Sequence, residues 1–410
     1  MWIFFWGILL TRSSLGLGHK PERKAASGAD SPVWSVDLRS VGFTGYAPKQ
    51  ETWGLNLRPN PLYFTDNKVL IATFITREVV TTLARRDQPG ESLPLKLHGI
   101  FLDADTGKVQ VSKEWPITRP RGGVVASGDG RFIVLTPGLV ALYSPSLELV
   151  KDFKLSPEQQ SHLWDFHVSP TGQSILVEYH YPDSSFQWID AGSLQPQPAW
   201  KDLLTHVFIF DNGLAFEQNP NLTSGVSHKV LIRPRDGPER TICRVLTGQV
   251  NSSCGDPEFV SDDVLALTMP HGLTLVPKSG GDVLLKASFR DDEWLGHPLH
   301  PSADGKRFAA TLWEHKGGSA LLDIGFHSVL KRIEIYNLPN PHPIYTLDAK
   351  QRKIKDVSGV ALSPDGYLMA ILTDGVVEVY QIPPEHTDTV DLKNGNLHLQ
   401  VPIPAAKPKP

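Results

Sequence analysis

The strongest constraint on this chain is a short hairpin signal that recurs along it. It consists of a serine, any residue, an Asp or Thr, a glycine, and then an apolar run. Full copies are SGDGRFIVL, SPTGQSILVEY, SADGKRFAATL and SPDGYLMAIL, whose serines at positions 127, 169, 302 and 363 are 42, 133 and 61 residues apart. Weaker copies begin at Phe64, Phe210 and Ser261. Because Asp-Gly and Asn-Gly pairs adopt the positive φ of tight hairpin turns, each copy predicts two antiparallel strands.

A second repeated element follows the first. VEVYQIP (377–383) matches IEIYNLP (333–339), and LVALYSP (139–145) is similar. The alternation of apolar and polar residues indicates a further strand in each unit, with room for a fourth. Four antiparallel strands in every 40–50 residues or so are typical of a β-propeller blade. The sequence therefore predicts an all-β chain forming a single seven-bladed β-propeller of four-stranded antiparallel blades. The blades are expected at 55–118, 119–158, 159–203, 204–247, 248–291, 292–350 and 351–383.

The last predicted blade has only three clear strands, which would leave its outer edge open. Exposed strand edges promote aggregation, so proteins usually cover them. VWSVDL (Val33–Leu38) alternates as a half-buried strand does, and we expect it to close the ring. NLHLQVPI (Asn396–Ile403) is the alternative closing strand.

The two ends of the chain differ in composition from the repeats. MWIFFWGILL is too short to cross a bilayer, but it suits the apolar part of a signal peptide, although no basic residue precedes it. We expect a signal peptide at 1–18, a polar linker at 19–31, the propeller at 32–383 and a tail at 384–410. The expected location is secreted or periplasmic, with no stable membrane span in the mature protein. An oxidising compartment would allow Cys243 and Cys254, the only two cysteines, to form a disulfide.

Several classes of function lack support in the sequence. A net charge of −4 gives no electrostatic footprint for nucleic acid. The chain contains no nucleophile elbow, zinc-protease, P-loop or dinucleotide-binding motif. His297 and His300 have no further ligand at a spacing that completes a metal site, and the acidic run 291–293 is expected to be solvated. We therefore assign no catalytic, cofactor-binding or metal-binding residue.

Two resemblances to known families follow from these motifs. The SPDG hairpins resemble those of secreted bacterial WD-repeat-like and Tol-associated β-propeller proteins of unassigned activity. This resemblance implies a non-catalytic extracytoplasmic binding or protein-interaction scaffold. Asp103, Thr106, Gly107 and Lys108 resemble one copy of the quinoprotein repeat, although an ordinary turn also explains them. The alternative function is therefore a propeller enzyme, such as a quinoprotein dehydrogenase or a lactonase.

The second connections of the first and sixth predicted blades are long, at Arg77–Lys96 and His315–Lys331. Connections of the same order in a blade emerge on the same face of the ring, and binding is often carried by such insertions. A candidate binding rim for an unknown protein or an anionic or polar ligand comprises Arg85, Arg86, His315, Lys316, His327 and Lys331.

Overall fold

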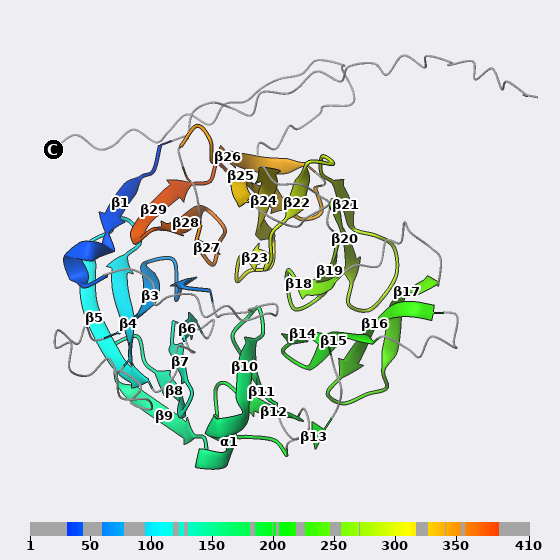
Figure 1. Ribbon diagram of the computed structural model, residues 1–410, viewed down its shortest axis with the longest axis horizontal. Coiled ribbons are helices and arrows are strands. Elements are labelled where there is room, and N and C mark those ends of the chain that lie inside the picture. The colour runs from blue at the N-terminus through cyan, green and yellow to red at the C-terminus, as the bar shows by residue number, and fades with distance from the viewer. Residues whose placement is uncertain are drawn as a thin grey trace, which may run out of the picture.

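Seven antiparallel sheets stand around a central axis (Figure 1). The computed structural model describes residues 31–43, 60–77, 95–117, 123–126, 130–180, 185–198, 200–201, 205–218, 226–246, 256–269, 271–316, 327–340, 342–352, 354 and 357–384. Six sheets have four strands, and one has five because its innermost strand is split in two. The chain is a seven-bladed β-propeller, as the repeats predicted.

The strands follow one another from the inside of each blade to the outside. The first four blades are β2 (Leu62–Phe64), β3 (Val69–Arg77), β4 (Leu95–Asp103) and β5 (Val109–Ile117); β6 (Gly123–Ala126), β7 (Phe132–Thr136), β8 (Leu139–Tyr143) and β9 (Leu149–Lys154); β10 (Leu163–Val168), β11 (Ser174–Tyr179), β12 (Ser185–Asp190) and β13 (Trp200–Lys201); and β14 (Thr205–Phe210), β15 (Gly213–Gln218), β16 (Val226–Pro234) and β17 (Arg240–Leu246). A short helix, α1 (Pro157–His162), joins β9 to β10.

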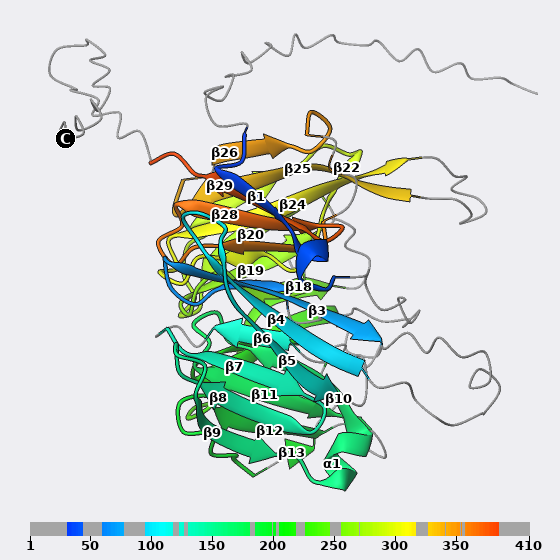
Figure 2. The same cartoon turned by 90° about the vertical axis from the view of Figure 1, so that its left-hand side faces the viewer.

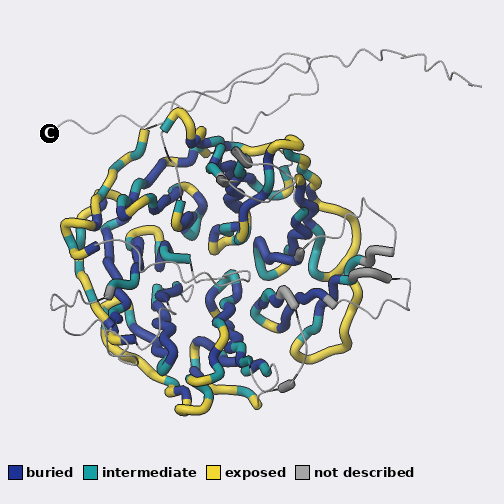
Figure 3. The backbone as a smooth tube through the Cα atoms, viewed as in Figure 1, coloured by how far each residue is buried: buried dark blue, intermediate teal, exposed yellow. Residues whose placement is uncertain are grey.

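The remaining three blades complete the ring, and each sheet lies within the range expected for its blade, except that the seventh also takes up β1. They are β18 (Asp256–Phe259), β19 (Val264–Met269), β20 (Gly272–Pro277) and β21 (Leu285–Ser288); β22 (Glu293–Leu295), β23 (His300–Pro301), β24 (Arg307–Lys316), β25 (His327–Asn337) and β26 (Pro343–Asp348); and β27 (Gly359–Leu362), β28 (Leu368–Thr373) and β29 (Val376–Gln381), joined by β1 (Trp34–Asp37). The buried residues lie mostly along the inner and middle strands, whereas the outer rim is largely exposed (Figure 3).

The recurring serine forms a buried hydrogen bond across its hairpin turn. Ser169, Ser302 and Ser363 are at most 3% exposed. The Oγ of Ser302 accepts a hydrogen bond from the backbone N of Arg307 at 3.0 Å, and the Oγ of Ser363 accepts one from the N of Leu368 at 2.9 Å. The serine thereby links the two strands across the turn. The copy at Ser127 lies outside the described residues.

Removing this hydroxyl should destabilise the propeller. We expect Ser363→Ala to lower the free energy of unfolding by about 1–3 kcal/mol, because the amide of Leu368 and the carboxylate of Asp365 lose a buried partner. Urea unfolding measures this loss. Ser146→Ala, at an exposed serine, is the control and should change stability by no more than about 0.5 kcal/mol. Equal stability of the two variants would contradict this role for the motif.

The hairpin turns also connect neighbouring blades. The hydroxyl of Thr171 donates to the carboxylate of Asp211 at 2.5 Å, and the N of Asp211 donates to the carboxylate of Asp262 at 2.7 Å. The N of Asp304 donates to the carbonyl of Pro364 at 3.0 Å. These turns share one face of the ring, which we call the hairpin face. Its polar repeat residues are therefore used in structural contacts between blades.

The N-terminal strand completes the seventh blade. β1 pairs antiparallel with β29, with Trp34 opposite Val379 and Asp37 opposite Val376. The closing strand expected at 33–38 thus occupies the outer edge of this sheet. A 3-10 helix, η1 (Leu38–Val41), follows it. The alternative strand at 396–403 lies outside the described residues.

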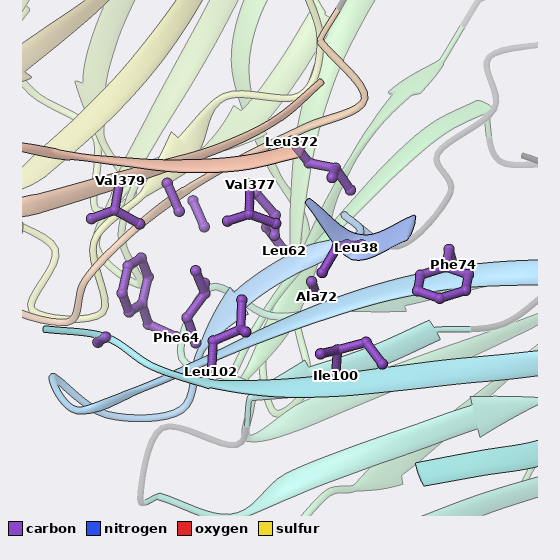
Figure 4. Packing of buried hydrophobic residues seen from close by; sticks show 14 of the residues in the cluster. Leu38, Leu62, Phe64, Ala72, Phe74, Ile100, Leu102, Leu372, Val377 and Val379 are labelled. Atoms are coloured by element: carbon purple, nitrogen blue, oxygen red, sulfur yellow. The ribbon is translucent and has the colours of Figure 1, made fainter. Parts of the chain in front are cut away.

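The closing segment also reaches the first blade. Leu38 and Phe43 are buried in a cluster with residues of β2, β3, β4, β28 and β29 (Figure 4). The ring of Phe43 meets that of Phe74 edge to face at 5.3 Å. The indole N of Trp34 donates to the carbonyl of Ala104 at 2.7 Å. We call residues 33–43 the clasp, because they pack on both the last and the first blade.

The turn that resembles a quinoprotein repeat lies against this clasp. The carboxylate of Asp103 accepts from the N and the hydroxyl of Thr106, at 2.9 and 2.7 Å. Gly107 has a φ of +70°, and a Cβ there would lie 2.5 Å from the ring of Trp34. The motif therefore forms a turn that receives Trp34, and this contact explains its glycine.

Candidate functional site

The central channel contains a cavity of about 240 Å³ that is lined by residues of all seven blades. The innermost strands β2, β6, β10, β14, β18, β23 and β27 surround it (Figure 1). Five aromatic side chains contribute to the wall, namely Tyr63, Phe64, Phe166, Phe208 and Phe259. Among the described residues that line it, Glu258 is the one carboxylate, and there is no lysine or arginine.

Glu258 lies on β18 and is held by two neighbours from the sixth blade. Its side chain is only 3% exposed. One carboxylate oxygen accepts from the backbone N of Leu299 at 2.5 Å, and the other contacts Nδ1 of His297. These contacts fix the carboxylate in the wall of the channel.

His300 also lines the cavity, and its imidazole carries no charge at neutral pH. Burial lowers the pKa of His300 to about 4, so its imidazole is neutral at neutral pH. Its Nδ1 lies 3.5 Å from the side-chain N of Asn60, which precedes β2. His297 and His300 thus have different side-chain partners, Glu258 and Asn60. Within the described residues, no three His, Cys, Asp or Glu side chains group as metal ligands would.

His167, from β10, begins a row of polar groups that leads from the cavity to the surface. Its Nε2 lies 2.8 Å from the carboxylate of Glu178, whose other oxygen lies 2.6 Å from Nε2 of His180. Burial lowers the pKa of His167, but the hydrogen bond to Glu178 and the charge of Asp165 outweigh this effect and raise it. The ring of His180 stacks on Trp164 with centroids 4.2 Å apart.

Trp164 is an exposed aromatic residue beside this row. Its exposed fraction is 41%. The pairing of β10 with β11 shifts register between Leu163 and Asp165, so Trp164 occupies a bulge. A bulge can redirect a side chain out of its expected alternation. Local sequence carries little signal for such a shift.

The strand ends that flank the two long connections of the candidate rim lie on one face, opposite the hairpin face. The ends of β3 and β4 and those of β24 and β25 project on the same side of the ring (Figure 2). We call this the loop face. Arg85 and Arg86 lie outside the described residues. His315 and Lys316 end β24, and His327 begins β25.

Lys331 is the rim residue whose side chain the structure describes. Its Nζ lies 3.1 Å from the carboxylate of Asp292 and 2.9 Å from that of Glu293. These two acids offset its positive charge locally. The contribution of Lys331 to a positive rim is therefore smaller than the sequence alone indicates.

Glu293 is the centre of an ionic cluster in the sixth blade. The side chain is 0% exposed, so the expectation of a solvated acidic run is wrong for this residue. Burial would raise the pKa of Glu293, but hydrogen bonds from Arg332 and Lys331 lower it to about 2. Glu293 lies on β22, which pairs with β24, and its carboxylate contacts Lys331 and Arg332 of β25, the strand on the other side of β24.

Two other expectations concern the disulfide and a membrane span. Cys243 lies in β17, whereas Cys254 lies outside the described residues, so the disulfide stays a prediction. No helix in the described part of the chain is long and apolar enough to cross a membrane.

Comparisons with known proteins identify structural likeness only. No family model and no curated protein matches the sequence. A chain from "Crystal Structure of Mitotic Checkpoint Complex" is 13% identical, with 93% of this chain and 100% of that chain covered and a TM-score of 0.46. The WD40 domain of Neurospora crassa Pan2 is 11% identical over 87% and 96% of the two chains, with a TM-score of 0.46. Hsv2 of Kluyveromyces lactis is 13% identical over 63% and 73%, with a TM-score of 0.40. At these scores, the fold assignment rests on the seven sheets of this chain.

Proposed function

We propose that this protein is a non-catalytic extracytoplasmic scaffold that holds a protein partner on its loop face. The observation that carries the proposal is the placement of the strand ends that flank 78–94 and 317–326, the two longest connections between strands of one blade. β24 and β25 have 10 and 11 residues, and β3 and β4 have 9 each, so these hairpins are longer than most others in the ring. The first and sixth blades flank the seventh, so the ends of β3, β4, β24 and β25 lie on neighbouring parts of one face. Binding residues are commonly carried by loops on a rigid scaffold.

The channel supports the same function. Two separate His–Glu pairs lie at the walls, His167 with Glu178 and His297 with Glu258. We assign none of these side chains a catalytic role. The quinoprotein-like turn packs on Trp34, which gives it a structural role. The apolar N-terminal run supports a location outside the cytoplasm.

Shortening both long connections should abolish capture of the partner. The variant replaces 78–94 and 317–326 with short Gly-Ser turns, and pull-downs from native extract are read by mass spectrometry. We expect partner recovery to fall at least about tenfold, because a few interface residues dominate binding energy. The matched control replaces 278–284, between β20 and β21 on the hairpin face, and should retain the partner. Retention of every specific partner by the folded loop variant would refute the proposal.

The positive residues of the rim can be tested separately. Arg85→Glu with Arg86→Glu should weaken capture of an anionic partner, and the remaining binding should depend less on salt. Pull-downs at low and high ionic strength measure this dependence. Unchanged recovery and unchanged salt dependence would show that these arginines take no part.

A further inference from the structure

We propose that the central cavity binds a small organic ammonium ion, with Glu258 as its counter-charge and the surrounding aromatic rings as its apolar walls. The proposal concerns the channel rather than the loop face, so it does not depend on the scaffold function. It rests on the charge of the lining, the identity of the rings and the size of the cavity.

The charge of the described lining favours a cation. Glu258 is the one carboxylate there, and no lysine or arginine accompanies it. His300 is neutral because burial lowers its pKa to about 4. The charge on His167 is balanced by Glu178 at 2.8 Å. The carboxylate of Glu258 has the imidazole of His297 as its partner, so a bound cation would share the carboxylate with that histidine, whereas an anion would meet no arginine or lysine.

The carboxylate is also positioned before any ligand arrives. The backbone N of Leu299 and Nδ1 of His297 each hold one oxygen of Glu258. A carboxylate oxygen has two lone pairs, so each can accept a further hydrogen bond. The side chain is 3% exposed, and a charge in such surroundings interacts more strongly with an opposite charge than it would in water.

The aromatic residues supply the second part of the recognition. Tyr63 and Phe64 come from the first blade, and Phe166, Phe208 and Phe259 come from the third, fourth and fifth. Aromatic ring faces attract cations, and ammonium groups bearing methyl substituents combine this attraction with apolar contact. A cavity of about 240 Å³ suits a small ion of this kind. A bare metal ion fits less well, because no three metal ligands group within the described residues.

Choline and its uncharged isostere 3,3-dimethylbutan-1-ol test the proposal directly. Isothermal titration calorimetry on the full chain should show choline binding at least about tenfold more tightly than the isostere, because only choline meets the carboxylate and the rings as a cation. Equal affinity for the two compounds, or no binding of choline at millimolar concentration, would overturn the proposal.

Two variants separate the counter-charge from the rings. Glu258→Gln keeps an acceptor for the N of Leu299 and should remove the preference for choline, whereas Glu148→Gln, at an exposed position, should keep it. If the Glu258 variant does not fold, Phe208→Leu replaces it and should weaken choline binding at least about threefold. A folded Glu258 or Phe208 variant that binds choline as the wild type does would overturn the assigned site.

Discussion

Deletion of residues 1–43 should open the ring, whereas deletion of residues 1–30 should leave it closed. The longer deletion removes β1, which pairs with β29, and it removes Leu38 and Phe43 from the core. Loss of two large buried side chains and a strand should cost about 5 kcal/mol or more and expose the edge of β29. We expect a melting temperature lower by roughly 10 °C and increased aggregation. Equal melting temperatures for the two deletions would show that another segment closes the ring.

A point variant tests the same contact without removing a strand. Gly107→Ala places a Cβ 2.5 Å from the ring of Trp34 at a backbone φ of +70°. Gly280 has a φ of +84° and nothing within 4 Å of an added Cβ, so Gly280→Ala carries the backbone cost alone. We expect the Gly107 variant to be the less stable of the two by about 1–3 kcal/mol in urea unfolding. Equal losses would mean that the turn does not support the clasp.

Replacement of Glu293 should also lower the free energy of unfolding substantially. Glu293→Gln removes the buried carboxylate that Lys331 and Arg332 share and leaves them with Asp292 and Glu334, so we expect a loss of about 3 kcal/mol, the lower end of the range for a broken buried pair. Asp291→Asn changes an exposed acid in the same segment and should change stability by no more than about 0.5 kcal/mol. Chemical unfolding of both variants decides whether the cluster is structural.

The same residue predicts how stability depends on pH. The pKa of Glu293 is about 2 in the folded protein, below its value in the unfolded chain. The folded state therefore binds fewer protons, so the stabilisation is complete above about pH 4.5 and is lost as the pH falls toward 2. Glu293→Gln should have a flatter stability profile over this range. Parallel profiles for the wild type and the variant would contradict the low pKa.

The hairpins and the blade order could be predicted because their signals are local. Asp-Gly turns and alternating runs depend on adjacent residues, and the open edge of the last blade pointed to Val33–Leu38 as its cover. The burial of Glu293 could not be predicted in this way, because its partners Lys331 and Arg332 come from a strand that follows almost 40 residues later. When only the acidic run 291–293 is considered, solvent-exposed side chains are the natural prediction.

The residues that line the channel could not be predicted from the sequence either. Its composition depends on which residues of seven separate inner strands face the axis, and no single segment reveals this. The bulge at Trp164 likewise arises from strand pairing, and so do the hydrogen bonds that join His167, Glu178 and His180. The sequence predicted a ring with a channel, but it did not predict the carboxylate and aromatic rings that line it.

Cross-linking of the native complex, read by mass spectrometry, tests the central claim that the loop face binds the partner. Lys96 lies at the start of β4, Lys316 is the last residue of β24, and Lys331 lies on β25 beyond the end of β26, all toward the loop face, whereas Lys68, Lys278 and Lys306 lie in connections of the hairpin face. We predict that lysine-reactive cross-links to the partner are concentrated at the first three residues. Cross-links concentrated at Lys68, Lys278 and Lys306 would place the partner on the opposite face and contradict the account.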